Sequence, residues 1–323
     1  MKMPVSFISN GLRAYFRGDL RFRLSFHASL PTRPLPLLCA LLVLGGSLLA
    51  AAQPLELRLR SLQQTKPGLD QWATVETPVQ WAPAGTAVVI CDMWDKHWCR
   101  GATARVAEMA GRMNQVVTEL RQRGVLIIHC PSETMPFYEG TPGRKLAQAA
   151  PRVSPKVALP GWCRLEGVKE PPLPIDDADG GCDDQPPCQA GAPWRRQIAT
   201  LEIQAGDAIT DNAEAYNLMR QRAITNVIVM GVHQNMCILG RPFAIRQMVC
   251  QGQQVVLMRD LTDSMYNSRR QPCVDHFTGN DLVTWHIEKY WCPTITSDQI
   301  IGGQPFRFAA DTRPPRLLHN DVK

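Results

Sequence analysis

Two short segments contain residue types that can act together in catalysis, a carboxylate in one and a thiol in the other. They read Asp92-Met93-Trp94-Asp95-Lys96-His97-Trp98-Cys99 and Gly231-Val232-His233-Gln234-Asn235-Met236-Cys237. Each segment directly follows an apolar, strand-like run. A cysteine becomes a strong nucleophile once its thiol is deprotonated, and a nearby carboxylate can accept that proton. Asp92 and Cys237 therefore form a candidate base and nucleophile of a hydrolase.

The position of Cys237 strengthens this interpretation. It falls where the loop after a strand-like run becomes helix-like, and the N-terminus of a helix stabilises a negative charge placed there. Backbone N–H groups of the same tight turn can stabilise an oxyanion. The alternatives are an unreactive cysteine at a helix start and, for Asp92, an N-cap of the helix that follows.

These residues need a scaffold, and strand-like and helix-like segments alternate along the chain. Apolar runs indicate strands at 87–91, 125–129, 226–232 and 254–258, with a weaker one at 199–203. Helical spacing is seen at 102–123, 212–222 and about 237–250. This pattern predicts an α/β fold, a three-layer α/β/α arrangement of Rossmann-like type around a mostly parallel sheet. In such sheets reactive groups gather at the carboxyl ends of the strands.

The segments outside this alternation suggest a domain plan. Residues 1–52 are expected to be a signal peptide or an N-terminal anchor, 53–80 an arm over the surface, and 81–323 the catalytic domain. A long loop-rich insertion is expected at 131–198, which holds 12 of the 26 Pro. A loop of this length inside a compact domain is usually functional or disordered. We expect an ordered insertion near the site.

The net charge of +6 is concentrated at the N-terminus. Residues 1–52 hold six of the 35 Lys and Arg but one of the 29 Asp and Glu. The remaining body is nearly neutral, which argues against a nucleic-acid partner. A basic flank, a short apolar run at 37–44 and small residues at 50–52 are typical of a signal peptide. We expect an exported protein, periplasmic or extracellular, held at a membrane only if this segment stays uncleaved.

The second chemical segment also resembles a known family. Gly-Val-His-Gln-Asn-Met-Cys, followed by Ile-Leu-Gly-Arg-Pro, is similar to the nucleophile segment of the isochorismatase-like cysteine hydrolases, the group that contains nicotinamidases. The resemblance covers about 83–130 and 199–265. It implies that Cys237 is the nucleophile, Asp92 the general base and Val232–His233 a cis peptide bond. It also implies an oxyanion hole formed by the N–H groups of His233 and Cys237, and a small amide as substrate.

The sequence departs from the family pattern at several positions. The family places a lysine on or after its third strand, but no Lys lies between Lys169 and Lys289. Its expected place falls near Gln204. The candidates for a substitute charge are Arg195, Arg196 and Lys96, and Glu202 is the nearest ionisable group.

Two other family features differ. The metal cluster that nicotinamidases carry after the second strand is missing from 129–134, so we predict no metal and no cofactor. Aromatic residues follow the base, and Trp94, His97 and Trp98 are expected to contact the substrate.

Several alternatives stay open. The chain could instead hydrolyse a vinyl ether, as isochorismatases do with the aspartate alone, or be a non-catalytic exported member of the family. The partner is expected to be a small-molecule substrate, and a homo-oligomer is possible. Among the cysteines, Cys182 could pair with Cys188, either could pair with Cys163, and Cys273 could pair with Cys292. The acidic stretch 176–184 could bind calcium or be a solvated turn.

Overall fold

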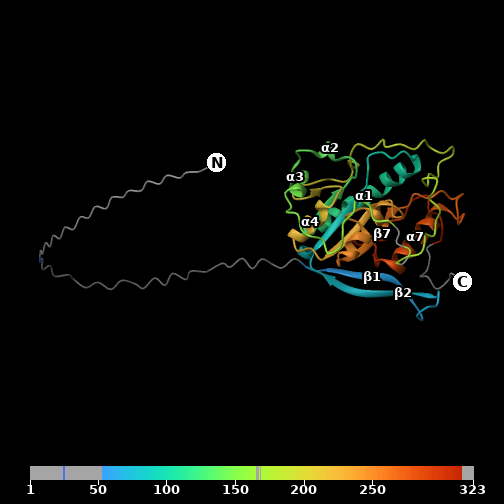
Figure 1. The fold of residues 1–323 in the computed structure, drawn as a ribbon, viewed down its shortest axis with the longest axis horizontal. Helices are drawn as coiled ribbons and strands as arrows, with labels where there is room; N and C mark the ends of the chain where they lie inside the picture. Colours follow the sequence, from blue (N-terminus) through green and yellow to red (C-terminus); the bar gives the residue numbers. More distant parts are fainter. Residues whose placement is uncertain (1–24, 26–52, 165–166, 168, 315–323) are drawn as a thin grey trace, which may run out of the picture. The chain divides into compact units, whose positions relative to one another are not determined.

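The computed structural model describes Ser25, residues 53–164, residue 167 and residues 169–314. The helices and strands lie within residues 50–323, which form one compact unit of the chain (Figure 1). The expected signal peptide, residues 1–52, falls outside the described residues except for Ser25, so export stays a prediction. Among the described residues, no helix is both long and apolar enough to cross a membrane.

The centre of the fold is one eight-stranded sheet with the strand order β2-β1-β8-β7-β6-β3-β4-β5. Its five interior pairings, from β8 to β5, are parallel, and β1 pairs antiparallel with both β2 and β8. The strands are β1 (Leu55–Gln64), β2 (Trp72–Trp81), β3 (Thr86–Cys91), β4 (Leu126–Cys130), β5 (Ala208–Ile209), β6 (Asn226–Val232), β7 (Gln254–Asp263) and β8 (Thr294–Ile295).

Helices cover both faces of the sheet. They are α1 (Arg100–Gln122), α2 (Met135–Tyr138), α3 (Pro142–Gln148), α4 (Glu214–Gln221), α5 (Cys237–Gly240), α6 (Ile245–Cys250), α7 (His276–Tyr290) and α8 (Asp298–Ile301), with a 3₁₀ turn, η1, at Pro83–Gly85. One core packs α1 and α8 against the face that presents Val88 and Ile90 of β3. A second core packs α4, α6 and α7 against the opposite face, which presents Val89. The predicted three-layer α/β/α fold is confirmed.

The segment expected to be a surface arm is instead a β-hairpin that extends the sheet. β1 and β2 pair over their whole length, with Leu57 opposite Val79, and Arg60 of β1 lies opposite Thr294 of β8. Leu55 and Leu57 are buried and belong to the first core. Figure 1 shows the hairpin along one edge of the body. The period-two alternation of Leu in this segment was the signal for a strand.

Two further elements differ from the sequence-based expectation. The third strand lies at β5, Ala208–Ile209, and not at 199–203, which forms turns. The helix expected at about 237–250 is split into α5 and α6, because Pro242 lacks an N–H group and forces the preceding residue out of helical conformation. Arg241 is accordingly extended, with φ −68° and ψ 156°.

The insertion 131–198 begins with the short helices α2 and α3, and its described residues beyond Gln148 form no helix or strand. Side chains nonetheless fix it to the body. Glu170 is buried and contacts Arg246 at 2.7 Å and His286 at 2.7 Å. Asp183 pairs with Arg105 of α1 at 2.8 Å. Apolar residues of the insertion, Ile175 among them, also pack in the second core. The insertion is therefore fixed by polar and apolar contacts with the body, with little regular structure of its own.

The expected disulfides are not formed. Cys182, Cys188, Cys273 and Cys292 all carry free thiols. The acidic residues of 176–184 do not converge on one point either. Asp176 pairs with Arg270 and Asp179 accepts from Asn267, so they face different partners.

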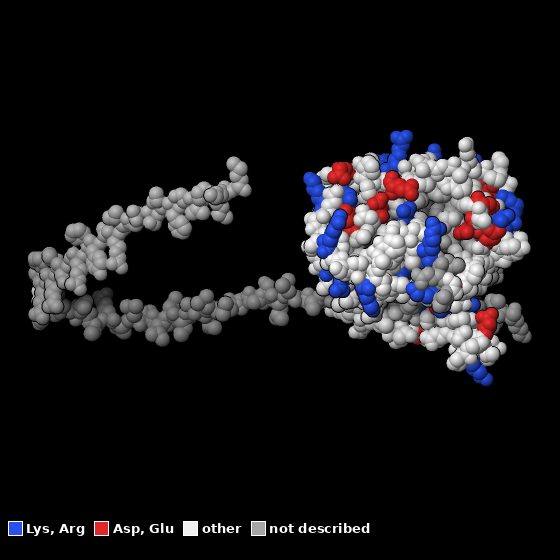
Figure 2. Space-filling model, viewed as in Figure 1, with Lys and Arg blue, Asp and Glu red and all other residues white. Residues whose placement is uncertain are grey.

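The surface of the body carries charges of both signs. On the face shown in Figure 2, small groups of Lys and Arg and small groups of Asp and Glu are interspersed, some next to each other, with uncharged surface around them.

Candidate active site

A close approach of two neighbouring strands brings the two chemical segments together. β3 and β6 are paired, and Cys91 lies opposite Gly231. Gly231 has φ +107°, and a Cβ atom there would lie 2.0 Å from the carbonyl oxygen of Cys91. Only glycine fits this position. The carboxyl end of β3, which leads into Asp92, therefore lies directly beside the carboxyl end of β6, which leads into His233 and Cys237.

Asp92 is fully buried and adopts φ 48°. Its Oδ1 atom accepts a hydrogen bond of 2.8 Å from the N–H of Ser132, while Oδ2 has no hydrogen-bond partner. Burial raises the pKa of the Asp92 carboxyl, against opposing effects of Arg241 and of the Cys237 side chain. One oxygen is thus anchored and the other is free to accept a proton. The alternative role of Asp92 as a helix N-cap is wrong, because Cys99 caps α1.

Cys237 is the first residue of α5 and is 9% exposed. α5 spans only four residues, so its N-terminus is a single turn rather than the start of a long helix. The side chain of Cys237 interacts with Asp92 and with Arg241. The contact with Asp92 lacks the geometry of an ordinary hydrogen bond, since Oδ2 stays without a partner. The predicted base and nucleophile are therefore brought together.

The turn from β6 to α5 is the place where the family resemblance implies an oxyanion hole. The Val232–His233 peptide bond is cis, as expected from the resemblance. Among the described residues, neither the N–H of His233 nor that of Cys237 donates to another backbone group, whereas the intervening N–H of Gln234 bonds to Asp263 at 2.9 Å. The assignment of the two free amides to an oxyanion stays a prediction.

Side chains hold this turn in place, and sequence reasoning missed them. Gln234 donates to Ser264 at 3.0 Å and to the carbonyl of Asn280 at 2.6 Å. Asn235 donates to Asp177 of the insertion at 2.7 Å. The insertion thus helps to fix the segment that carries the nucleophile.

The positive charge of the site comes from Arg241, which sequence reasoning also missed. Its Nε atom lies 3.8 Å from Asp92 Oδ2, and its Nη2 atom lies 3.5 Å from Glu133 Oε1. The guanidinium also lies over the ring of Trp162, 5.6 Å from the centroid. The break at Pro242 makes this possible, because it ends α5 at Gly240 and leaves Arg241 extended. The signal available in the sequence was the Gly-Arg-Pro at the end of the family-like motif.

The candidates named from the sequence for this charge lie elsewhere. Arg196 pairs with Asp95, Nε to Oδ2 at 3.9 Å, and covers the ring of Phe137. Arg195 is exposed, and its N–H also bonds to Asp95. Lys96 lines a cavity described below. Gln204 and Glu202 are exposed and hydrogen-bond to each other. None of these five side chains forms an ion pair with Asp92.

The three predicted substrate-contact residues form one aromatic group. Trp94 stacks on Trp194 of the insertion at 4.4 Å between centroids, and its indole N–H donates to the carbonyl of Ser132. His97 lies 5.4 Å from Trp98 and 5.0 Å from His233. Burial, together with Arg105, lowers the pKa of His97 to about 4. His97 is therefore a neutral ring near physiological pH, and it links the aromatic group to the turn of the oxyanion hole.

A cavity of about 670 Å³ opens beside this group. It is lined by Lys96, His97 and Trp98, by the first turns of α1 and by residues within 189–193. Asp92 and Cys237 do not line it. His97 and Trp98 face this cavity, and Trp94 instead packs between Ser132 and Trp194. The cavity thus lies beside part of the aromatic group and does not contain the candidate catalytic pair.

Comparisons with known proteins find similar chains among solved structures. No protein-family model and no curated protein matches the chain. Among solved structures, a cysteine hydrolase from Pseudomonas syringae pv. phaseolicola is 18% identical, with a TM-score of 0.43, over 68% of this chain and 92% of that one. An isochorismatase from Pseudomonas putida is 12% identical, with a TM-score of 0.41, over 68% and 91%. An isochorismatase family protein from Burkholderia thailandensis is 12% identical, with a TM-score of 0.39, over 67% and 94%. Similarities this distant do not indicate an activity by themselves.

Proposed function

We propose that the protein is a cysteine hydrolase that cleaves the C–N bond of a small amide through a thioester on Cys237. The observation that carries the proposal is the convergence of a nucleophile, a buried carboxylate with one free oxygen and a fixed cation. The Cys237 thiol meets Asp92, and Arg241 lies 3.8 Å from the same carboxylate. The family-like motif around Cys237 supports the same chemistry.

The proton moves between Cys237, Asp92 and the leaving group. Asp92 accepts the thiol proton as the sulfur attacks the amide carbonyl. The resulting oxyanion is held by the N–H groups of His233 and Cys237. Asp92 returns the proton to the leaving amine, and the C–N bond breaks. Water then attacks the thioester, gives a proton to Asp92, and the thiolate of Cys237 recovers it. Arg241 stays protonated throughout and supplies only a fixed charge.

The proposal is tested by an ammonia-release screen of small primary amides with purified protein. Cys237→Ala is expected to abolish turnover. Asp92→Asn is expected to lower kcat/KM by about 10²- to 10⁴-fold, the usual contribution of a general base. Circular dichroism checks that both variants fold. Full activity of either folded variant contradicts the mechanism.

A second candidate is vinyl-ether hydrolysis, in which Asp92 acts as the acid and the thiol is not needed. The raised pKa of the buried Asp92 carboxyl favours this reading, because a carboxyl that holds its proton longer can protonate a vinyl ether. Alkylation with iodoacetamide separates the two reactions. Amide hydrolysis is lost when Cys237 is alkylated, whereas an aspartate-only reaction survives if the substrate still fits.

A further inference from the structure

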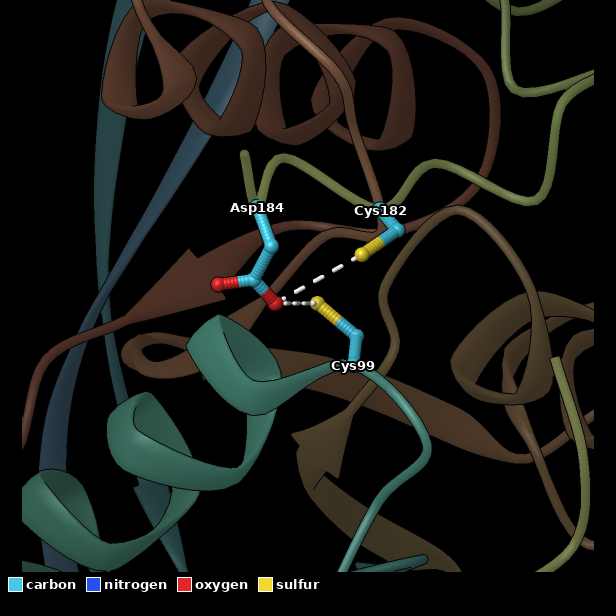
Figure 3. Close-up of side chains that lie close together, drawn as sticks. All are labelled: Cys99, Cys182 and Asp184. Atoms are coloured by element: carbon cyan, nitrogen blue, oxygen red, sulfur yellow. Dashed lines mark hydrogen bonds between the residues drawn. The ribbon is translucent and has the colours of Figure 1, made fainter. Parts of the chain in front are cut away.

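Three thiols surround one carboxylate oxygen at a place that the proposed reaction does not use. The Sγ atoms of Cys188, Cys99 and Cys182 lie 3.1, 3.3 and 3.6 Å from Oδ2 of Asp184. Figure 3 shows Cys99 at the start of α1 pointing toward Cys182 and Asp184 of the insertion. Cys99 is fully buried and Cys182 is 5% exposed. Four metal-ligating side chains from two distant parts of the chain thus converge on one point.

The backbone holds this cluster firmly. Cys99 is the N-cap of α1, and its Sγ accepts from the N–H of Ala102 at 3.5 Å. The N–H of Gly101 donates to Asp184 Oδ2 at 3.1 Å. On the insertion side, Gly181 has φ +72°, and a Cβ atom there would lie 2.2 Å from the carbonyl oxygen of Met265. The residue before Cys182 must therefore be glycine for the loop to pack this closely.

We propose that Cys99, Cys182, Cys188 and Asp184 form a binding site for a zinc ion. In a tetrahedral zinc site the Zn–S distance is about 2.3 Å and the Zn–O distance about 2.1 Å, which places sulfur and oxygen about 3.6 Å apart. The three sulfur-to-oxygen distances, 3.1, 3.3 and 3.6 Å, are close to this value. The ligand atoms of Cys99, Cys182 and Asp184 all lie within 4.8 Å of one another. Cys188 is not in that group of three, and the proposed site requires its sulfur to move closer to the other ligands.

The chemistry of the donors selects the metal. Three sulfur ligands and one carboxylate suit zinc, whereas calcium and magnesium take oxygen ligands. Binding replaces three S–H bonds by three Zn–S bonds and releases three protons to solvent. The bound site carries a formal charge of −2. Arg100 lies 3.9 Å from Asp184, so one cation for this charge is in place.

The site has a structural role, because its four ligands leave no open position on the ion. It ties the insertion to the N-terminus of α1. Trp98 and Met236, the latter the residue before Cys237, pack against the same small cluster. The ion therefore fixes surroundings of the active site without taking part in the reaction. This inference does not depend on the proposed amide hydrolysis.

The test measures metal content and affinity in untagged, reduced protein. One zinc per chain is expected by mass spectrometry of the metal. Cobalt(II) added to the metal-free protein is expected to give a thiolate-to-cobalt charge-transfer band and the strong visible bands of tetrahedral cobalt. Cys182→Ser and Asp184→Asn should each weaken zinc binding by more than about 100-fold, beyond the loss usual for residues that only support ligands. The matched control is Cys250→Ser, a half-buried cysteine outside the cluster.

Three results would overturn the proposal. They are reduced protein that binds no zinc, zinc binding that the cluster variants leave unchanged, and a Cys182–Cys188 disulfide in the protein as isolated. Peptide mapping after alkylation without reductant detects that disulfide. If Cys182→Ser fails to fold, Cys188→Ser is measured in its place, since Cys188 is only half-buried. A second readout is proteolysis, in which zinc removal should expose the insertion to cleavage in wild type and not change the cleavage rate in Asp184→Asn.

Discussion

At the scale of single residues, the cation of the candidate site is an arginine where the family resemblance implies a lysine. The difference matters because a guanidinium stays charged at any working pH and cannot pass a proton. Arg241 interacts with Asp92 and with the Cys237 side chain, and it can therefore act on them only through its fixed positive charge. All proton transfers in the proposed reaction fall to Asp92.

This role predicts a specific change in the pH dependence of activity. Arg241 lowers the pKa of Asp92, opposing the effect of burial. Asp92 can accept a proton only above its pKa, so activity falls on the acid side. In Arg241→Gln this acid limb of kcat/KM should move to higher pH. Arg241→Lys keeps the charge and should leave the limb near its wild-type position.

The matched control for this prediction is Arg196→Gln. Arg196 pairs with Asp95, not with Asp92, and belongs to no part of the proposed machinery. Its pH profile should coincide with that of the wild type. An acid limb that stays in place in Arg241→Gln would show that Arg241 does not set the charge state of Asp92.

Only part of this site could be predicted from the sequence. Asp92 and Cys237 could be found because each follows a strongly apolar run that predicts a strand. Arg241 could not be found by the same route, since a continuous helix over 237–250 would place it on a helix surface. Only the break at Pro242 brings it to Asp92. The Cys99–Asp184 cluster was equally hidden, because its halves lie 83 to 89 positions apart and neither half has a metal-binding spacing.

At the scale of elements, the β1–β2 hairpin shows why one segment was misread. Leucines alternate with polar residues in β1, but β2 mixes apolar and polar residues without strict alternation and contains a Pro. The second half of the hairpin therefore lacks the periodicity that predicts a strand. The short strand β5 was misplaced for a different reason. Two residues carry no periodicity, and only pairing with β4 defines them as a strand.

The hairpin should contribute to stability as part of the core. Leu57 is 2% exposed and packs in the same core as α1. Leu57→Ala is expected to lower the free energy of unfolding by about 2–5 kcal/mol, because it removes buried surface and leaves a cavity. Urea denaturation measures this change. Glu56→Ala, one residue earlier on the exposed face of β1, is the control and should change it by less than about 0.5 kcal/mol.

At the scale of the whole molecule, the insertion is held by buried charges rather than by a core of its own. Arg105 of α1 bonds to Asp263 at 2.7 Å and to Asp183 at 2.8 Å, and His276 bonds to the other oxygen of Asp263 at 2.8 Å. Burial alone would raise the pKa of Asp263, but Arg105 and His276 bring it well below the usual range. The same network that orders the insertion lies next to the histidines of the active site. The stability of the fold near the site should therefore depend on pH.

His97 provides the measurable part of this dependence. Burial and Arg105 lower its pKa to about 4, and the N–H of Cys99 donates to its Nδ1 at 3.1 Å, which requires a neutral ring. In the unfolded chain a histidine titrates near pH 6.5. Below that pH, His97 binds a proton in the unfolded state but stays unprotonated in the folded state. His97 should therefore cost about 1.4 kcal/mol of stability for each pH unit between about 6 and 4.5.

The measurement compares wild type with His97→Gln by urea denaturation at several values of pH. Above pH 7 the two free energies of unfolding should run parallel, because His97 is neutral in both folded and unfolded protein. Between pH 6 and 4.5 the wild type should lose stability more steeply than the variant. Titrating groups that do not interact with His97 are common to both proteins and cancel in the difference. His233 is the exception, because His97 helps to lower the pKa of His233. Equal slopes would mean that His97 takes up its proton in the folded protein, and that its ring is not held neutral against the turn that carries Cys237.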